Sequence, residues 1–141
     1  MFRHAALRPL SRGHQRVLFH AREMKRVPEE ALRAFLGYAR RELPRHFDAE
    51  ERVLLPALLA RLPQGDPSID RVRAAHAEIR ERVAALTAAE APSPDAVREL
   101  ARVLHDHVRD EERNLFPLAE RVLGADGLAE IARDLGQEYV I

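Results

Sequence analysis

Apolar residues recur every three or four positions along most of the chain, as they do on one face of an α-helix. One such stripe consists of these residues: Ile69, Val72, His76, Ile79, Val83 and Leu86. A second stripe, between Leu7 and Met24, has the same alternation and contains His14. Each stripe predicts an amphipathic helix that turns one histidine toward the core.

Prolines, glycines and short polar residues divide the chain into separate predicted helices. We expect them over residues 10–24, 28–62, 68–89 and 95–122, with a short fifth helix over residues 128–135. Pro44 and Pro56 lie inside the long second helix, so they should kink it unless it divides near Glu42. The last residues, 139–141, are expected to pack back on the body.

Long helices joined by short loops indicate an all-α fold, an antiparallel up-down four-helix bundle with a short C-terminal helix. Capping residues mark two of the helix starts, with Asp66 or Ser68 before the third helix and Ser93 before the fourth. Aromatic residues make up 5% of the chain, so we expect no sheet. The length of 141 residues, 46% of them hydrophobic, predicts a single domain over residues 1–141.

A motif of the form His-x-x-x-Glu-Glu-Arg occurs twice in the chain. It begins at His46 and again at His107, 61 positions later, and in both copies a leucine and a proline follow at the same offsets. Residues four apart on a helix point in nearly the same direction. His46 with Glu50, and His107 with Glu111, therefore each form a predicted metal-ligand pair.

Burying four imidazoles and two carboxylates in an apolar bundle would cost on the order of several kcal/mol for each unpaired group, unless cations compensate. The chain has no cysteine, so any metal must be held by nitrogen and oxygen, which suits Fe, Zn or Mn. The candidate ligands are His14, His46, Glu50, His76, His107 and Glu111. We expect two metals, each with two histidines and a share of both glutamates, and with positions open to water or a diatomic ligand.

Each candidate histidine, and each His-x-x-x-Glu pair, has a simpler interpretation when it is considered alone. A histidine on an apolar stripe is often a core side chain satisfied by a carbonyl, and a His-x-x-x-Glu pair on a helix surface contributes only about 0.2–0.5 kcal/mol. The spacing argues against these alternatives. The two histidines without a following glutamate, His14 and His76, are 62 positions apart, and the motif histidines are 61 apart, as a duplicated two-helix hairpin requires. We call His14 and His76 the lone histidines.

The other histidines and charged neighbours of the motifs are not expected to bind metal. His4, His20 and His105 fall off the stripes and are predicted to be solvated or structural. The residues after the motif glutamates point to a flanking face. Glu51 and Glu112 are therefore expected to pair with arginines, so that replacing them changes metal binding little, and Arg52 and Arg113 are expected on the surface.

Charge and hydropathy bear on partners and location. Lysine plus arginine equals aspartate plus glutamate at 23 each, so the chain lacks the positive field that holds nucleic acid or an anionic membrane. We expect no nucleic-acid partner. The longest mostly apolar stretch, residues 53–60, is too short to span a bilayer, and no apolar leader is evident at the N-terminus. We therefore expect a cytoplasmic protein without membrane contact.

At these residues the chain resembles the hemerythrin-like HHE cation-binding domain family, whose pattern is a lone histidine followed by His-x-x-x-Glu, twice over. The pattern is matched here by His14, His46, Glu50, His76, His107 and Glu111, and the resemblance extends from Pro9 to Leu118. It implies a hemerythrin-like four-helix bundle with a non-haem di-iron centre. Members of the family carry oxygen, sense oxygen, redox state or iron, or handle nitric oxide.

One departure from the family bears on function. Oxygen-carrying hemerythrins have a second histidine four residues after that of the third helix, and an aspartate five residues after the last histidine. This chain has Arg80 at the first of these positions, and its acidic residue, Glu111, follows His107 by four. The resemblance therefore implies a metal site more than it implies oxygen carriage.

We accordingly expect a metal-binding protein with two non-haem Fe ions that senses or binds oxygen, reactive oxygen or nitrogen species, or iron. Its partners would be metal ions and a small diatomic ligand such as oxygen or nitric oxide, and Zn or Mn could substitute for Fe. One alternative is a di-iron oxidoreductase acting on peroxide or nitric oxide. It ranks second because no acid or base beyond the ligands is evident. Another is a helical scaffold with a structural metal.

Overall fold

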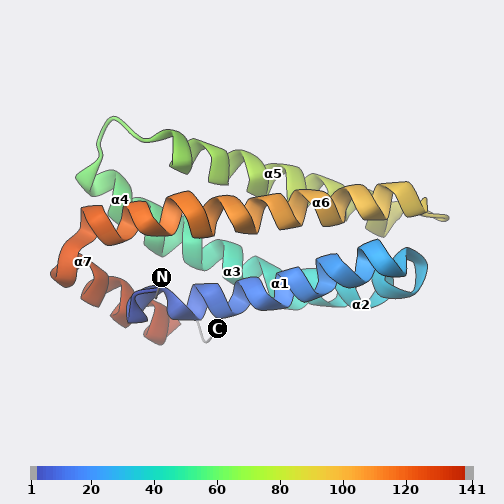
Figure 1. The fold of residues 1–141 in the computed structure, drawn as a ribbon, viewed down its shortest axis with the longest axis horizontal. Helices are drawn as coiled ribbons and strands as arrows, with labels where there is room; N and C mark the ends of the chain where they lie inside the picture. The colour runs from blue at the N-terminus through green and yellow to red at the C-terminus, as the bar shows by residue number, and fades with distance from the viewer. Residues whose placement is uncertain (1–2, 139–141) are drawn as a thin grey trace.

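The computed structural model describes residues 3–138, which are helical over most of their length (Figure 1). The elements, in chain order, are the 3₁₀ turn η1 (Ala5–Leu7), α1 (Arg8–Arg26), α2 (Pro28–Arg41), α3 (Leu43–Ala49), the π-helical turn η2 (Glu50–Leu54), α4 (Leu55–Arg61), α5 (Pro67–Ala88), α6 (Pro94–Asp110), the π-helical turn η3 (Glu111–Leu115) and α7 (Phe116–Glu138). No strand occurs between residues 3 and 138, which confirms the predicted all-α fold. The predicted packing of Tyr139, Val140 and Ile141 lies outside the described residues.

The helix boundaries follow the local chemistry of the sequence. The long second helix divides at Glu42, as the sequence allowed, and Pro44 lies in the first turn of α3, where its missing N–H is tolerated. The Asp66 side chain, and not that of Ser68, caps α5, because its Oδ1 accepts the Ser68 N–H at 2.8 Å. The Ser93 hydroxyl caps α6 in the same way.

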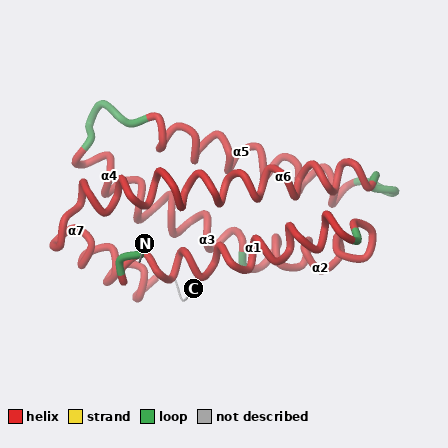
Figure 2. Tube along the Cα trace, in the orientation of Figure 1, coloured by secondary structure: helices red, strands yellow, loops and turns green. Residues whose placement is uncertain are grey.

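The main helices run along the long axis of the molecule, and the loops between them are short (Figures 1 and 2). Helix α1 packs against α2 and α6, and α6 packs against α5. The predicted end of the fourth helix is found at Gly124, whose φ of 66° and ψ of −176° break α7 into two parts. Helix α7 contacts η1 and α4, so its chain returns toward the N-terminal turn.

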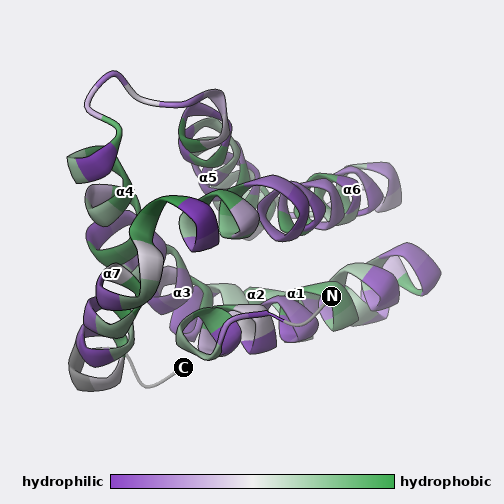
Figure 3. Ribbon diagram, turned by 60° about the vertical axis from the view of Figure 1, so that its left-hand side comes forward, coloured by the Kyte–Doolittle hydropathy of each residue, from purple (hydrophilic) through white to green (hydrophobic). Residues whose placement is uncertain are grey.

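Two apolar clusters make up the core, and the helices turn their hydrophobic faces toward one another around them (Figure 3). One cluster includes Leu10 and Val72, and the other includes Val17 and Ile79. Each lone histidine lies on its helix between a member of the first cluster and a member of the second. The fold thus has a polar layer between two apolar halves.

None of the helices in the described part of the chain is both long enough and apolar enough to cross a membrane.

Candidate metal centre

Six buried polar side chains meet between the two apolar clusters, and we call them the His–Glu cluster. They come from four helical segments and are those singled out in the sequence: His14, His46, Glu50, His76, His107 and Glu111. Each is at most 5% exposed. The structure thus brings together all six residues that the sequence predicted as ligands.

The His–Glu cluster consists of two overlapping groups. In the first, His14 and His46 lie with Glu50 and Glu111, and in the second His76 and His107 lie with the same two glutamates. Within each group, one nitrogen or oxygen atom of every side chain lies within 4.8 Å of the corresponding atoms of the others. Each group therefore offers two imidazoles and two carboxylate oxygens, a number and type of donors that suit one divalent cation.

The carboxylates divide their oxygens between the two groups. Glu50 Oε2 lies 3.1 Å from His46 Nε2, while its Oε1 lies 3.0 Å from His76 Nε2. Glu111 Oε1 lies 2.7 Å from His14 Nε2, while its Oε2 lies 3.3 Å from His107 Nε2. Both glutamates are thus placed as bridges between two neighbouring cation positions.

Several atoms of the cluster are buried without a hydrogen-bond partner among the described residues. They are His46 Nδ1, Glu50 Oε1, His76 Nε2, both ring nitrogens of His107, and Glu111 Oε2. His76 Nε2 and Glu50 Oε1 lie 3.0 Å apart but form no hydrogen bond. This arrangement is expected of two ligand atoms that point toward the same cation position. Unpaired buried polar atoms are destabilising. Cations between them would satisfy most of these atoms, so the residues present fit a metal centre.

The charges in the cluster depend on burial and on neighbouring groups. Burial opposes protonation of His14, but three nearby carboxylates, with Glu111 foremost, raise its pKa well above 6.5. The pKa of His76 is raised to about 10, since Glu111 and Glu50 outweigh burial. Burial would raise the pKa of Glu50, yet neighbouring imidazoles, His46 foremost, bring it well below 4.5. The metal-free cluster thus holds protons that a bound cation would displace.

A π-helical turn follows each motif histidine and begins at the glutamate itself. The Leu55 N–H donates to the Glu50 carbonyl, five residues back, and the Phe116 N–H donates to the Glu111 carbonyl in the same way. A proline comes next in both copies of the motif. Because proline has no N–H and its ring collides with the carbonyl four residues back, the wider turn accommodates it. The turns leave His and Glu four apart on one regular helical face.

Glu51 and Glu112 lie outside the cluster but touch it. Both pair with an arginine, as predicted: Glu51 with Arg80 at 2.9 Å, and Glu112 with Arg3 at 3.3 Å. Each also lies against the Nδ1 atom of a lone histidine, a contact that sequence reasoning missed. The presence of a second glutamate in both copies of the motif was the one signal in the sequence that could have indicated these contacts.

Two phenylalanines hold the lone histidine rings. Phe47 stacks on His76 with ring centroids 3.8 Å apart, and Phe116 stacks on His14 with centroids 5.3 Å apart. The guanidinium group of Arg80 lies over the Phe47 ring, and that of Arg3 lies over the Phe116 ring. Each lone histidine is thereby fixed by packing as well as by hydrogen bonding.

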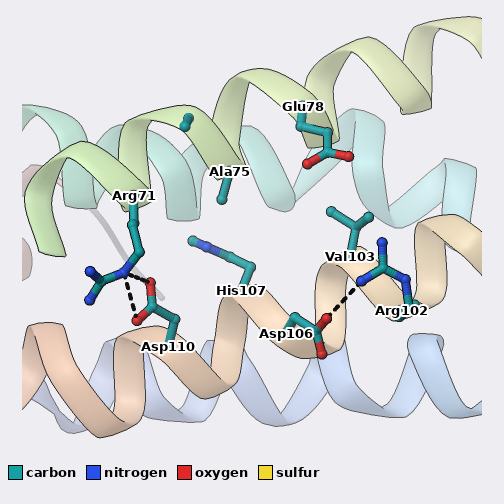
Figure 4. Close-up of a pocket in the computed structure, with 9 residues that line it drawn as sticks. Arg71, Ala75, Glu78, Arg102, Val103, Asp106, His107 and Asp110 are labelled. Atoms are coloured by element: carbon teal, nitrogen blue, oxygen red, sulfur yellow. Dashed lines mark hydrogen bonds and ion pairs between the residues drawn. The ribbon is translucent and has the colours of Figure 1, made fainter. Parts of the chain in front are cut away.

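The motif histidines are packed differently. A Cβ atom on Gly13 would lie 2.4 Å from His46 Nδ1, so glycine is required where α1 passes this ring. His107 points from α6 toward α5 near Ala75 and forms part of the wall of an open groove of about 430 Å³ (Figure 4). Burial lowers the pKa of His107. The groove brings solvent close to one edge of the cluster.

The histidines and arginines that were not expected to bind metal lie away from the cluster. His4 Nδ1 accepts the Ala6 N–H and caps η1, and His105 is partly exposed beside Asp106. His20 packs against aromatic rings of α2. Arg52 and Arg113 are exposed, as expected.

The fold and the site define the class to which the protein belongs. It is a helical protein with a buried cluster of imidazoles and carboxylates suited to divalent cations. The family model for the hemerythrin HHE cation binding domain matches residues 3–119, and the chain belongs to this family. The family resemblance found in the sequence is confirmed.

A curated relative extends the comparison. The chain is 27% identical over 111 residues to a protein named "DNA nickase" from Nostoc sp. (strain PCC 7120 / SAG 25.82 / UTEX 2576). The aligned region covers 78% of this chain but 31% of the relative, so the chain spans about a third of that protein. No solved structure gives a significant match.

Proposed function

We propose that residues 1–141 form a single domain, an antiparallel four-helix bundle that holds a non-haem di-iron centre through the His–Glu cluster. The observation that carries the proposal is the sharing of Glu50 and Glu111 between two groups of ligands. Each group then has two histidines, His14 with His46 and His76 with His107. This donor set also accommodates Zn or Mn as substitutes for Fe.

The function we propose is the sensing or binding of oxygen, reactive oxygen or nitrogen species, or iron. Two bound irons would supply one-electron redox chemistry and positions open to a small diatomic ligand such as oxygen or nitric oxide. Four donors in each group are fewer than an octahedral ion takes. The groove beside His107 is the route we propose for water and small ligands.

Arg80 favours sensing over reversible oxygen carriage. Its guanidinium cannot coordinate a cation, and it pairs with Glu51 at 2.9 Å and lies over the Phe47 ring. Neither group therefore gains a fifth protein donor from this position, and the two groups remain equivalent in donor type. Greater access of water to both positions favours lasting oxidation over release of unchanged oxygen.

The test is to cycle the iron-loaded protein with oxygen. Oxygen is added to the anaerobic ferrous protein and then purged, while the optical spectrum and the ferrous iron content are recorded. We expect the irons to give up electrons to oxygen and to stay ferric after purging. Return of the ferrous spectrum through repeated cycles would overturn sensing by oxidation and support oxygen carriage.

We also make proposals for the partners and the location of the protein. We propose that its partners are metal ions and a small diatomic ligand. We propose that it acts in the cytoplasm. The name DNA nickase belongs to a relative of which this chain spans about a third, and this chain has no excess of basic over acidic residues to hold a nucleic-acid backbone. We therefore propose no nucleic-acid partner for this chain.

A further inference from the structure

The second glutamate of each motif crosses to a lone histidine on another helix. Glu51 Oε2 lies 2.6 Å from His76 Nδ1, and Glu112 Oε2 lies 2.7 Å from His14 Nδ1. Nε2 of each lone histidine is directed at the glutamates of the cluster, Glu50 and Glu111. The contacts with Glu51 and Glu112 are therefore made by Nδ1, the ring nitrogen that faces away from the cluster. The two halves of the chain repeat the same arrangement.

We propose that Glu51 and Glu112 are positioning residues of the metal centre, each holding a lone histidine with its proton on Nδ1 and its Nε2 free for the cation. This inference rests on the proposed function. A histidine that binds a metal usually donates its other N–H to a carboxylate or carbonyl, which fixes the tautomer and strengthens the ligand. Here Glu51 and Glu112 provide that carboxylate.

The carboxylates are themselves held in place. Arg80 donates to both oxygens of Glu51, at 2.9 and 3.0 Å. Glu112 accepts from the Ser11 hydroxyl at 2.7 Å and from Arg3 at 3.3 Å. A carboxylate with several fixed donors keeps its orientation, so it can align the histidine ring that it contacts.

The contacts link the two halves of the chain. His14 belongs to the first group of ligands, yet its outer partner Glu112 comes from the second motif. His76 belongs to the second group, yet its outer partner Glu51 comes from the first motif. Each proposed cation position therefore depends on the opposite half for the alignment of one histidine.

The motif histidines do not share this support. His46 Nδ1 and His107 Nδ1 are buried without a hydrogen-bond partner among residues 3–138. Loss of Glu51 or Glu112 should therefore weaken one cation position and spare the other. This expectation replaces the one drawn from the sequence, that removing either residue changes metal binding little.

The test compares Glu51→Gln and Glu112→Gln, which keep the size of the side chain and remove its charge. Iron affinity is measured anaerobically by competition with a chromophoric chelator, and the iron environments are compared by Mössbauer spectroscopy. Glu23→Gln is the matched control, since it makes the same substitution in an ion pair of α1, with Arg26, away from the cluster. Glu78→Gln, at an exposed ion pair on α5, is the surface control.

We expect each variant at Glu51 or Glu112 to bind one of the two iron equivalents about 10–100-fold more weakly than the wild type. The single iron environment of the wild type should split into two, and both controls should differ from the wild type by less than about threefold. Helix content of the metal-free variants, measured by circular dichroism, should equal that of the wild type.

Other outcomes overturn the inference. If the wild type binds two equivalents and both variants match it, the proposed function stands and the positioning role is wrong. If both equivalents weaken together as helix content falls, the glutamates act only on folding. If the wild type binds no iron, the proposed function fails, and the inference fails with it.

Discussion

Glu50 and Glu111 lie at the centre of the cluster, because each presents one oxygen to each group of histidines. Both are fully buried. A terminal ligand such as His46 lies in only one of the two groups. Loss of a bridging glutamate should therefore affect both cation positions, whereas loss of one histidine should affect chiefly its own.

We predict that Glu50→Ala reduces the iron content of the reconstituted protein from about two ions per chain to fewer than about one, since both positions lose an oxygen donor. Glu111→Ala should behave in the same way. Metal analysis after removal of free iron provides the measurement, with Glu78→Ala on the exposed surface of α5 as the control. Retention of two ions per chain by Glu50→Ala would mean that this carboxylate is not a bridge.

At the residue scale the sequence contained most of the information on the cluster. Spacing by four places His46 and Glu50, or His107 and Glu111, on one helical face, whatever the tertiary fold. The contacts of Glu51 and Glu112 could not be obtained in this way. They depend on which neighbouring helix faces the flank of the motif, and the spacing within one helix does not contain that information.

At the scale of elements, the contact between Gly13 of α1 and the His46 side chain of α3 shapes the first group of ligands. Gly13 lies one residue before His14, and its missing side chain leaves room for the His46 ring. The corresponding residue before His76 is Ala75, which lines the groove at His107. A small residue thus precedes each lone histidine and lies beside a motif histidine.

We predict that Gly13→Ala displaces the His46 ring, because the new Cβ would lie 2.4 Å from Nδ1 and 2.8 Å from Cε1. Iron at the first group should bind more weakly, and the overpacking should cost about 1–3 kcal/mol of unfolding free energy. Urea unfolding and iron titration measure the two effects. The control is Gly37→Ala on α2, whose Cβ would meet only the flexible Arg41 side chain. Equal stability and affinity in both variants would contradict the prediction.

The π-helical turns are the feature of the helices that the sequence did not predict. Hydrophobic periodicity assumes a constant helical pitch, so it indicated one long helix through Glu50 and another through Glu111. Pro56 signalled an irregularity in the first of them, but its position alone does not say whether the helix kinks or widens. The structure has the wider turn in both copies.

At the scale of the whole molecule, the His–Glu cluster divides the core into two apolar clusters. Without cations the bundle must enclose two carboxylates and several unpaired ring atoms between them. A protein of this construction should gain stability when metal compensates those groups.

We predict that removing metal by chelation lowers the thermal midpoint. For a free metal concentration about a hundred times its Kd, each site adds about 2.7 kcal/mol. For two sites this corresponds to a shift on the order of 20 °C in a chain of this size. Calorimetry of metal-free and reloaded protein, with Mg²⁺ as the control cation, gives the comparison. Equal midpoints would show that the six side chains do not share buried metal.

The arrangement of the helices could be predicted for the part of the chain that contains the two copies of the histidine pattern. The near-equal spacing of the lone and motif histidines indicated two similar helical hairpins, and each hairpin supplies the two histidines of one group and one of the two shared glutamates. The return of α7 after Gly124 could be expected only as a helix end followed by a short helix. Its packing on η1 and α4 depends on surfaces that no local pattern specifies.

The central claim is that the cluster holds two metal ions bridged by Glu50 and Glu111. Anomalous diffraction from crystals of the iron-loaded protein, collected on both sides of the iron absorption edge, tests it most directly. The account predicts two peaks, one between the carboxylates and His14 with His46, the other between the carboxylates and His76 with His107. A single peak, or peaks outside the cluster, would contradict it.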